Sequence, residues 1–454
     1  MAFQSAASMS WPSGSLFRFP PNPNSGFIPP PPAGSTPSAP PVTIPDSIYH
    51  AALDPRLPIT VAVVYAVSAK ALNAYNRSTG KRPWAISKTL AFRCFVILHN
   101  VFLALYSAWT FLGMLRTLRR AVVSPRGPLG FSGFLDSLCQ LNGPRGLGNA
   151  AFFDDETNSW RSYSTEPVLN QDGVPSRLAA GRIWNEGLAF YGWLFYLSKF
   201  YEVFDTLIIL AKGKLSSTLQ TYHHAGAMLC MWAGMRYMAV PIWIFVCFNS
   251  FIHSIMYTYY TATALNIRVP MFIKRTLTSL QITQFVLGTS AAMVHSFINY
   301  TIPVRTNSQT DIGLAPPAIN GSGGAATELD SLLDVEGAYD RQVMPCITSS
   351  GETFAIWLNV VYLLPLTYLF ISFFVESYIR RGNTRQSSKR GAEGSAAAAV
   401  RHLSNDVHSA GWEAAQNVNR EMYEESAEDE AVSAEGNQAN GRVAANGRVL
   451  RRRH

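Results

Sequence analysis

Three histidines within apolar stretches are the residues of this chain best suited to do chemistry. His223 and His224 are adjacent in one stretch, and His253 lies in the next. An imidazole is costly to place in lipid, so an intramembrane histidine usually faces the protein interior and has a function. Neutral imidazole can act as a nucleophile, and it can also accept or donate a proton. We therefore predict that these three side chains are catalytic.

A polar stripe surrounds His253. Asn249, His253, Met256 and Tyr260 advance by four, three and four residues, and Tyr257 lies alongside. Those steps keep side chains on one face of an α-helix. Such a face in an apolar helix is turned toward protein or a cavity, so we expect Asn249, Tyr257 and Tyr260 to contact a substrate.

A second polar stripe follows at intervals of three residues and comprises Thr278, Gln281 and Gln284. These neutral side chains can donate and accept hydrogen bonds. Gln281 and Gln284 are therefore candidate substrate contacts in the same interior. Hydrogen bonding between helices explains the pattern nearly as well.

A charged group precedes the histidine pair. Lys199, Glu202 and Asp205 are spaced i, i+3 and i+6, so they share one helix face. They lie close to Lys212 and Lys214, where a phosphorylated substrate would find positive charge. The favoured interpretation is that the three side chains bind substrate. The alternative is a purely structural ion network.

Seven stretches of the 454-residue chain reach the length that crosses a bilayer, about 20 residues. The mean hydropathy of +0.07 hides them, because very polar ends dilute an apolar middle. The sequence therefore predicts an all-α integral membrane protein with seven transmembrane helices. They lie near residues 57–72, 89–115, 184–211, 218–235, 238–263, 276–297 and 353–376.

An odd number of spans puts the two ends of the chain on opposite sides of the membrane, and basic residues mark the cytosolic side. The connections at 73–88, after 211 and after 263 are basic, as is the start of the C-terminal tail, which favours the cytosol. The connection at 301–352 is acidic and contains the glycosylation sequon of Asn320, as a lumenal loop would. Residues 116–182 open with arginines, but long loops obey the charge rule poorly. We expect a lumenal N-terminus and a cytosolic C-terminus.

Composition predicts disorder at both ends. Residues 1–56 form a Pro-rich region and residues 381–454 a polar tail, and neither shows the apolar periodicity that a core requires. No cleaved signal peptide is indicated. The formal net charge of +8 suits anionic head groups or phosphorylated substrates, and no nucleic-acid motif accompanies it.

The five cysteines divide into two groups. Cys94, Cys230 and Cys247 lie within apolar stretches and are interpreted as packing residues. Cys139 and Cys346 lie in the two predicted lumenal insertions, at about 116–182 and 298–352, where oxidation is permitted. A disulfide between them is a hypothesis.

Four ordered motifs between about residues 57 and 380 resemble those of the ELO fatty acid elongases. The motifs are Lys199-x-x-Glu202-x-x-Asp205-Thr206, Leu219-Gln220-Thr221-Tyr222-His223-His224, Asn249-x-x-x-His253-x-x-Met256-Tyr257-x-Tyr259-Tyr260 and Thr278-x-x-Gln281-x-x-Gln284-Phe285. The resemblance implies that residues 57–380 form an elongase membrane domain. Six of its seven helices would form an inverted 3+3 barrel around an acyl tunnel.

The activity that this resemblance implies is that of a 3-ketoacyl-CoA synthase of the endoplasmic reticulum membrane. Such an enzyme condenses a long acyl-CoA with malonyl-CoA and needs no cofactor or metal besides these substrates. The resemblance further suggests that His223 carries the acyl group and that His224 and His253 move protons and stabilise an enolate. Asn249 or Gln281 would donate hydrogen bonds. Expected partners are membrane lipids, the reductases and dehydratase of the elongation cycle, and a second copy of the chain.

One residue departs from the family pattern, because Gln220 stands where the first histidine of a His-x-x-His-His box is expected. Glutamine cannot serve as a base or nucleophile at neutral pH. Either the first histidine is supportive in the family, which we favour, or this chain is a divergent or weakened member.

Two other classes of function compete with a condensing enzyme. A membrane di-iron desaturase or hydroxylase needs about eight clustered histidines. The chain has nine, of which four lie in the terminal regions, so the other five cannot build such a site. A non-catalytic lipid-binding protein or transporter could share the fold, since fold alone does not determine function.

Overall fold

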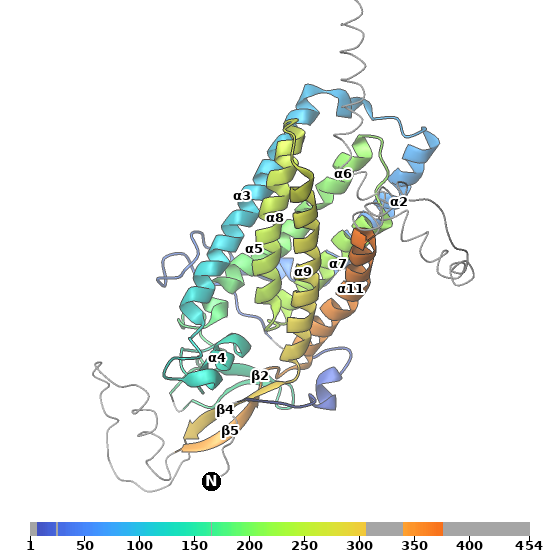
Figure 1. Ribbon diagram of the computed structural model, residues 1–454. Coiled ribbons are helices and arrows are strands. Elements are labelled where there is room, and N and C mark those ends of the chain that lie inside the picture. The colour runs from blue at the N-terminus through green and yellow to red at the C-terminus, as the bar shows by residue number, and fades with distance from the viewer. Residues whose placement is uncertain (1–6, 24–25, 165, 306–338, 376–454) are drawn as a thin grey trace, which may run out of the picture.

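The computed structural model describes residues 7–23, 26–164, 166–305 and 339–375, and it is mostly helical (Figure 1). Helices occupy all seven of the predicted stretches. They are α2 (Arg56–Ser78), α3 (Leu90–Ala121), the π-helical turn η3 (Trp184–Leu188) with α5 (Ala189–Tyr201) and α6 (Val203–Ala211), α7 (Thr218–Arg236), α8 (Ile242–Ala264), α9 (Met271–His295) and α11 (Ser350–Phe374).

Four of these helices are long and apolar enough to cross a membrane, namely α2, α3, α8 and residues Ser350–Ser372 of α11. The third stretch is divided at Glu202, which shortens its helices, whereas α7 and α9 carry many polar side chains. The structure therefore agrees with a multi-pass membrane protein. Seven spans remain a prediction.

Six of the helices contact one another in a closed order, α3, α8, α9, α11, α7 and α5, and α5 returns to α3. Helix α2 lies outside this ring, against α6 and α7. The ring surrounds the interior in which the candidate site lies, and each of the polar motifs belongs to one of its helices or to α6.

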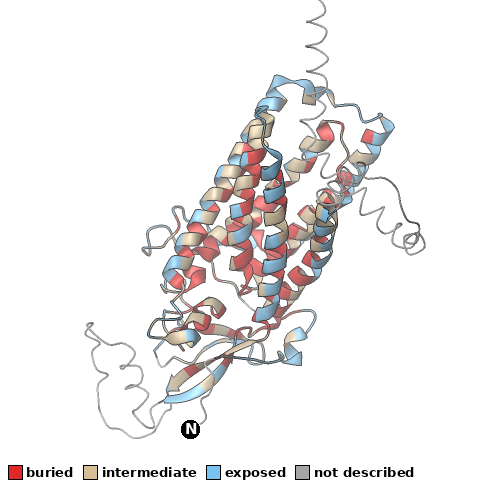
Figure 2. Ribbon diagram, in the orientation of Figure 1, coloured by how far each residue is buried: buried red, intermediate tan, exposed pale blue. Residues whose placement is uncertain are grey.

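The ring exposes large apolar side chains on its outer face and buries polar side chains among the apolar ones of its interior. On α3, Leu98 and Leu105 are exposed, while His99, Asn100 and Ser107 are buried. Figure 2 shows exposed residues along the outer faces of the long helices and buried residues between them. A lipid-facing surface accepts apolar side chains without cost, and polar side chains find partners only between helices.

Two small antiparallel sheets cover the end of the ring that is lower in Figure 1. Strand β1 (Ala7–Met9) pairs with β4 (Ile298–Arg305), which pairs with β5 (Tyr339–Pro345). Strand β2 (Ala151–Asp154) pairs with β3 (Ser159–Ser162). Helix α4 (Gly130–Cys139) lies at the same end, and the short helix η2 (Ala85–Lys88) precedes α3 at the opposite end. These sheets add strands to a chain for which helices alone were predicted.

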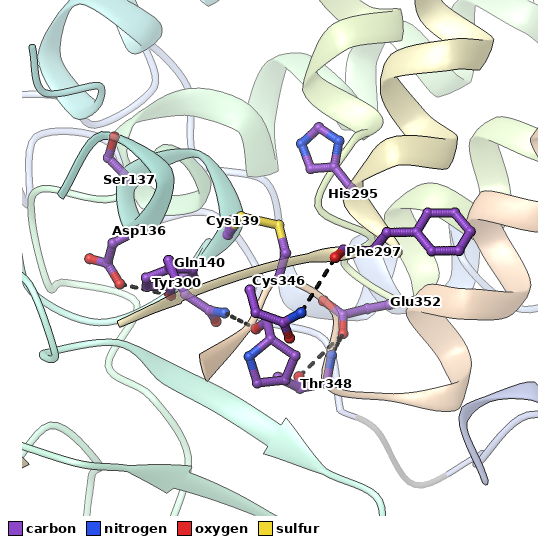
Figure 3. The surroundings of a disulfide bond; sticks show 12 residues. Asp136, Ser137, Cys139, Gln140, His295, Phe297, Tyr300, Cys346, Thr348 and Glu352 are labelled. Carbon is purple, nitrogen blue, oxygen red and sulfur yellow. Dashed lines mark hydrogen bonds between the residues drawn. A yellow bond between two sulfur atoms is a disulfide. The ribbon is translucent and has the colours of Figure 1, made fainter. Parts of the chain in front are cut away.

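A disulfide between Cys139 and Cys346 joins α4 to the segment after β5 (Figure 3). This is the pairing that the sequence suggested as a hypothesis. Beside it, the Tyr300 hydroxyl donates a hydrogen bond of 2.9 Å to Asp136, whose carboxylate also forms a buried 2.8 Å ion pair with Arg182. The two large insertions are therefore held together at one end of the ring. Asn320 lies outside the described residues.

The N-terminal region differs from the disorder that its composition predicts. Its described residues include η1 (Gly14–Phe17) and α1 (Asp46–Ala52), and Tyr49 is completely buried. Trp184 of the ring donates a hydrogen bond of 2.8 Å to the carbonyl of Ile28, and Trp232 donates one of the same length to Leu53. The prediction was wrong for residues 7–23 and 26–56, because a few anchoring contacts suffice for a Pro-rich segment with little conformational entropy to lose. The predicted C-terminal tail lies outside the described residues.

Candidate active site

A cavity lies inside the ring, between its middle and the end that carries the basic α6–α7 connection. Helices α3, α6, α7, α8, α9 and α11 all contribute to its wall. The predicted site residues that line it are His223, His224, His253, Asp205, Asn249, Tyr257, Tyr260, Gln281 and Gln284. Lys212 and Lys214 lie at one end of this lining. Apolar side chains such as Ile208, Ile252 and Phe370 complete it.

Helix α7 positions the adjacent histidines. The helix begins at Thr218 because the Ser217 side chain accepts a hydrogen bond of 3.1 Å from the Gln220 backbone N–H. His223 and His224 follow within the next two turns, and their ring centroids are 5.4 Å apart. The Nδ1 atom of His223 lies 2.9 Å from the Tyr362 hydroxyl of α11.

Glu202 lies between His224 and His253, at the break between α5 and α6. One carboxylate oxygen is 3.6 Å from His253 Nδ1, and the other is 4.0 Å from His224 Nδ1. Lys199 pairs with the same carboxylate at 2.7 Å and donates a hydrogen bond of 3.1 Å to Asn249. The Glu202 carboxylate thus faces the Nδ1 side of both imidazoles, although His224 Nδ1 and the oxygen nearest to it make no hydrogen bond within the described residues.

The positions of Lys199 and Glu202 differ from the favoured prediction that both bind substrate directly. Their side chains are 4% and 2% exposed, and neither lines the cavity. A buried lysine requires a counter-charge, which Glu202 provides at a distance of one helical turn. The two residues form the internal ion pair that the sequence offered as the alternative.

Asp205 reaches the cavity and is held from both sides. The Nε2 atom of His99 lies 2.7 Å from one carboxylate oxygen, and the Tyr257 hydroxyl donates a hydrogen bond of 2.7 Å to the other. The Asp205 side chain is 20% exposed, whereas the His99 side chain is completely buried. This network joins α3, α6 and α8 beside the catalytic candidates.

Two glutamines of α9, Gln281 and Gln284, line the cavity. Gln281 donates a hydrogen bond of 3.4 Å to the Met256 sulfur. The side-chain oxygen of Gln284 is buried and accepts no hydrogen bond from the described residues. Thr278 instead bonds to the Lys274 carbonyl of its own helix and does not line the cavity. The two glutamines are therefore placed to contact a bound molecule.

Gln220, the departure from the histidine box, also lines the cavity. It lies one turn before His223 on α7, toward the end that carries Lys214. Its amide can donate and accept hydrogen bonds there, but it cannot transfer a proton at neutral pH.

Two residues of this site were not predicted from the sequence. His99 stands in an apolar stretch, and an intramembrane imidazole is itself a signal of function that could have identified it. Tyr362 belongs to no motif. Its contact with His223 depends on the packing of α7 against α11, 139 residues apart, which no local pattern encodes.

A desaturase or hydroxylase would need a cluster of side chains that can bind metal ions. Within the ranges that the structure describes, no three or more His, Cys, Asp and Glu side chains lie together in a way that could hold a metal ion.

The chain belongs to the ELO family (GNS1/SUR4 family), whose model matches residues 50–386. This match confirms the family that the four motifs resemble. The described residues 7–23 and 26–49 lie before the matched region.

Individual relatives match shorter segments. A segment of 134 residues, 29% of this chain, is 32% identical to fatty acid elongase sre1 of Dictyostelium discoideum and spans 47% of that protein. A segment of 208 residues, 46% of this chain, is 27% identical to fatty acid elongase 2 of Trypanosoma brucei brucei and spans 62% of it. Human very long chain fatty acid elongase 3 is 35% identical over 104 residues, which are 23% of this chain and 38% of that protein. The chain thus matches less than two thirds of the length of each.

Proposed function

We propose that this protein is a 3-ketoacyl-CoA synthase that condenses a long-chain acyl-CoA with malonyl-CoA in very-long-chain fatty acid elongation. Family membership and the names of its relatives support a role in elongation. The observation that carries the condensation chemistry is the meeting of His223, His224 and His253 from two helices in one cavity. Such a cavity offers a nucleophile and two further imidazoles beside one substrate.

In the proposed first step, the His223 Nε2 lone pair attacks the thioester carbonyl carbon of the acyl-CoA. A carbon–nitrogen bond forms, the carbon–sulfur bond breaks, and CoA leaves as a thiolate that is protonated by solvent. Malonyl-CoA then enters and loses carbon dioxide, which gives an enolate. The enolate carbon attacks the acyl carbon, and the carbon–nitrogen electron pair returns to His223.

The other polar side chains suit the second step. His224 and His253 stabilise the enolate oxygen and move protons, while Glu202 compensates positive charge on either ring at 4.0 and 3.6 Å. Asn249 or Gln281 donates a hydrogen bond to the same oxygen. Lys212 and Lys214 hold the CoA phosphates at the cavity end, and the apolar tail lies among the helices.

The proposed function also implies a cellular location and a membrane topology. The proposed setting is the endoplasmic reticulum membrane, crossed seven times, with six helices arranged as two inverted three-helix units. The N-terminus and the disulfide-linked insertions are lumenal, where oxidation is permitted, and the C-terminus is cytosolic. A ketoacyl reductase, a dehydratase and an enoyl reductase must act on the product before it becomes a saturated acyl-CoA.

Turnover of labelled malonyl-CoA tests the proposal. Purified protein in lipid nanodiscs, given malonyl-CoA labelled at C2 and a long acyl-CoA, should form a 3-ketoacyl-CoA that is two carbons longer. His223→Asn should abolish this product, because asparagine keeps a donor near Tyr362 but has no nucleophilic nitrogen. His295→Gln is the matched control, since His295 is buried in α9 but does not line the cavity. Absence of product with the unaltered protein would overturn the function, and full activity of His223→Asn would overturn the nucleophile.

A further inference from the structure

Tyr362 makes two short contacts with one residue of α7. Its hydroxyl oxygen lies 2.9 Å from the Nδ1 atom of His223, and it donates a hydrogen bond of 2.9 Å to the backbone carbonyl of the same residue. Tyr362 does not line the cavity, whereas His223 does. The tyrosine therefore touches the candidate nucleophile from behind, on the side away from a substrate.

These two contacts determine which ring nitrogen of His223 carries the proton. A backbone carbonyl can only accept a hydrogen bond, so the single hydroxyl proton of Tyr362 is directed to it. The tyrosine oxygen then accepts from Nδ1, which must be protonated. In the opposite tautomer, Nδ1 would accept the Tyr362 hydroxyl proton, and no proton would then lie between the Tyr362 oxygen and the backbone carbonyl oxygen of His223. With Nδ1 protonated, the lone pair of the neutral ring is on Nε2.

The packing around Tyr362 holds its hydroxyl in this position. Gly226 lies three residues after His223 on α7, and a Cβ atom there would clash with the Tyr362 ring. The absence of a side chain lets the ring lie directly against the helix. The Tyr222 ring lies tilted against the Tyr362 ring at 5.4 Å between centroids, and its hydroxyl donates a hydrogen bond of 3.0 Å to the Tyr362 carbonyl. Residues one turn apart on α7 thus fix both the ring and the backbone of Tyr362.

We infer that Tyr362 is a positioning residue that selects the Nδ1-protonated tautomer of His223 and thereby exposes Nε2 as the nucleophile. This inference rests on the proposed function for its chemical consequence. The Tyr362 hydroxyl proton is hydrogen-bonded to the backbone carbonyl of His223, which cannot act as a base, so Tyr362 does not relay protons. His223 keeps its Nδ1 proton while Nε2 is acylated, and the resulting positive ring is stabilised by the tyrosine oxygen. When the enolate carbon attacks the acyl carbon, the carbon–nitrogen bond breaks and its electron pair returns to Nε2, so the ring is neutral again.

Two tyrosine-to-phenylalanine variants separate this role from packing. Tyr362→Phe keeps the ring against Gly226 but removes the hydroxyl. The rate of CoA release from acyl-CoA in a single turnover should fall about 10-fold, the factor that corresponds to one hydrogen bond. The KM for acyl-CoA should not change, because the substrate does not touch Tyr362. Tyr196→Phe is the matched control, because it removes a buried hydroxyl that donates a 2.8 Å hydrogen bond to a backbone carbonyl, that of Ala52, away from the cavity, and it should release CoA at the rate of the unaltered protein.

The tautomer itself can be observed without turnover. Solid-state NMR of protein with ¹⁵N-labelled histidine should show His223, identified by its absence in His223→Asn, as a ring protonated at Nδ1. In Tyr362→Phe this signal should shift toward the Nε2-protonated form. An Nε2-protonated His223 in the unaltered protein would overturn the inference, whether or not the variant folds. Equal CoA release by Tyr362→Phe and the unaltered protein would also overturn it, whereas no release by the unaltered protein would instead refute the proposed function.

Discussion

Glu202 is the residue whose charge holds the candidate site together. It is buried with Lys199 at 2.7 Å and faces the Nδ1 atoms of two histidines. Taking one charge out of such a pair leaves the other buried without compensation, which is far more costly than never having the pair. The ion pair therefore matters for both the stability of the fold and the arrangement of the imidazoles.

Neutralising Glu202 should destabilise the protein. For Glu202→Gln we expect the free energy of unfolding to fall by about 3–5 kcal/mol, because Lys199 loses its counter-charge. Thermal unfolding in detergent measures the change. The double variant Lys199→Met/Glu202→Gln should recover much of the loss, since no uncompensated charge remains.

The control for Glu202 is a solvent-exposed ion pair. Asp46→Asn breaks the 2.8 Å contact with Arg177, whose partners are 54% and 34% exposed, and should cost less than about 1 kcal/mol. Equal and small losses for Glu202→Gln and Asp46→Asn would show that the buried pair does not carry this role.

At the residue scale, spacing along the sequence predicted which side chains of α8 share one helix face. The steps of three and four around His253 place Asn249, Tyr257 and Tyr260 on the cavity wall, as expected of one helix face. The same rule could not distinguish Glu202, which is buried in the ion pair with Lys199, from Asp205, which lines the cavity. The reason is that the helix breaks between α5 and α6. Tyr362 and His99 depend on contacts between distant helices.

At the scale of elements, apolar length located the helices well. Each of the seven stretches contains a helix, and α3 begins one residue after the start of its predicted range, 89–115, and ends six residues beyond it. The strands were not predicted, because alternation of polar and apolar residues over a few positions is a weak signal. In addition, β1 and β5 each pair with β4, which lies far from β1 in the sequence. The ordered structure of residues 7–23 and 26–56 was not predicted either, because an average composition does not reveal the few side chains that anchor the segment.

The disulfide is the element-scale device that joins the two insertions. It closes a loop across a sequence separation of 207 residues, next to the Asp136–Arg182 ion pair. Replacing both cysteines, Cys139→Ser/Cys346→Ser, should lower the free energy of unfolding by about 2–5 kcal/mol, because the unfolded chain gains freedom. Thermal unfolding under non-reducing conditions measures it.

Cys94→Ser provides the comparison for the disulfide, because Cys94 is an exposed free cysteine of α3. Its unfolding temperature should equal that of the unaltered protein. If the double variant were as stable as Cys94→Ser, the disulfide would contribute nothing to holding the insertions on the ring.

At the scale of the whole molecule, the ring separates an apolar exterior from a cavity whose two regions differ in chemistry. The three histidines lie toward its middle, and Lys212 and Lys214 lie at one end. A substrate with an apolar tail and a charged phosphate head matches such a gradient. Positive charge at the entrance should attract the head group and orient the thioester toward His223.

Removing this charge should weaken substrate binding more than catalysis. For Lys212→Ala/Lys214→Ala we expect the KM for acyl-CoA to rise about 10-fold at low salt, with a smaller change in kcat. The dependence of KM on ionic strength should also decrease, because fewer charges remain to be screened. Lys70→Ala, on the exposed face of α2 and away from the cavity, should behave as the unaltered protein. A KM and salt dependence unchanged by the double substitution would contradict this assignment.

The proposed function depends on transfer of the acyl group to His223 before malonyl-CoA reacts, and mass spectrometry of the protein after exposure to acyl-CoA alone detects this transfer directly. We expect release of CoA without malonyl-CoA, a mass increase equal to one acyl group, and a modified peptide in which the group is on His223. Addition of malonyl-CoA should then remove the acyl group as 3-ketoacyl-CoA. An unmodified protein that releases CoA only when malonyl-CoA is present, or an acyl group on another residue, would show that His223 does not carry the acyl group.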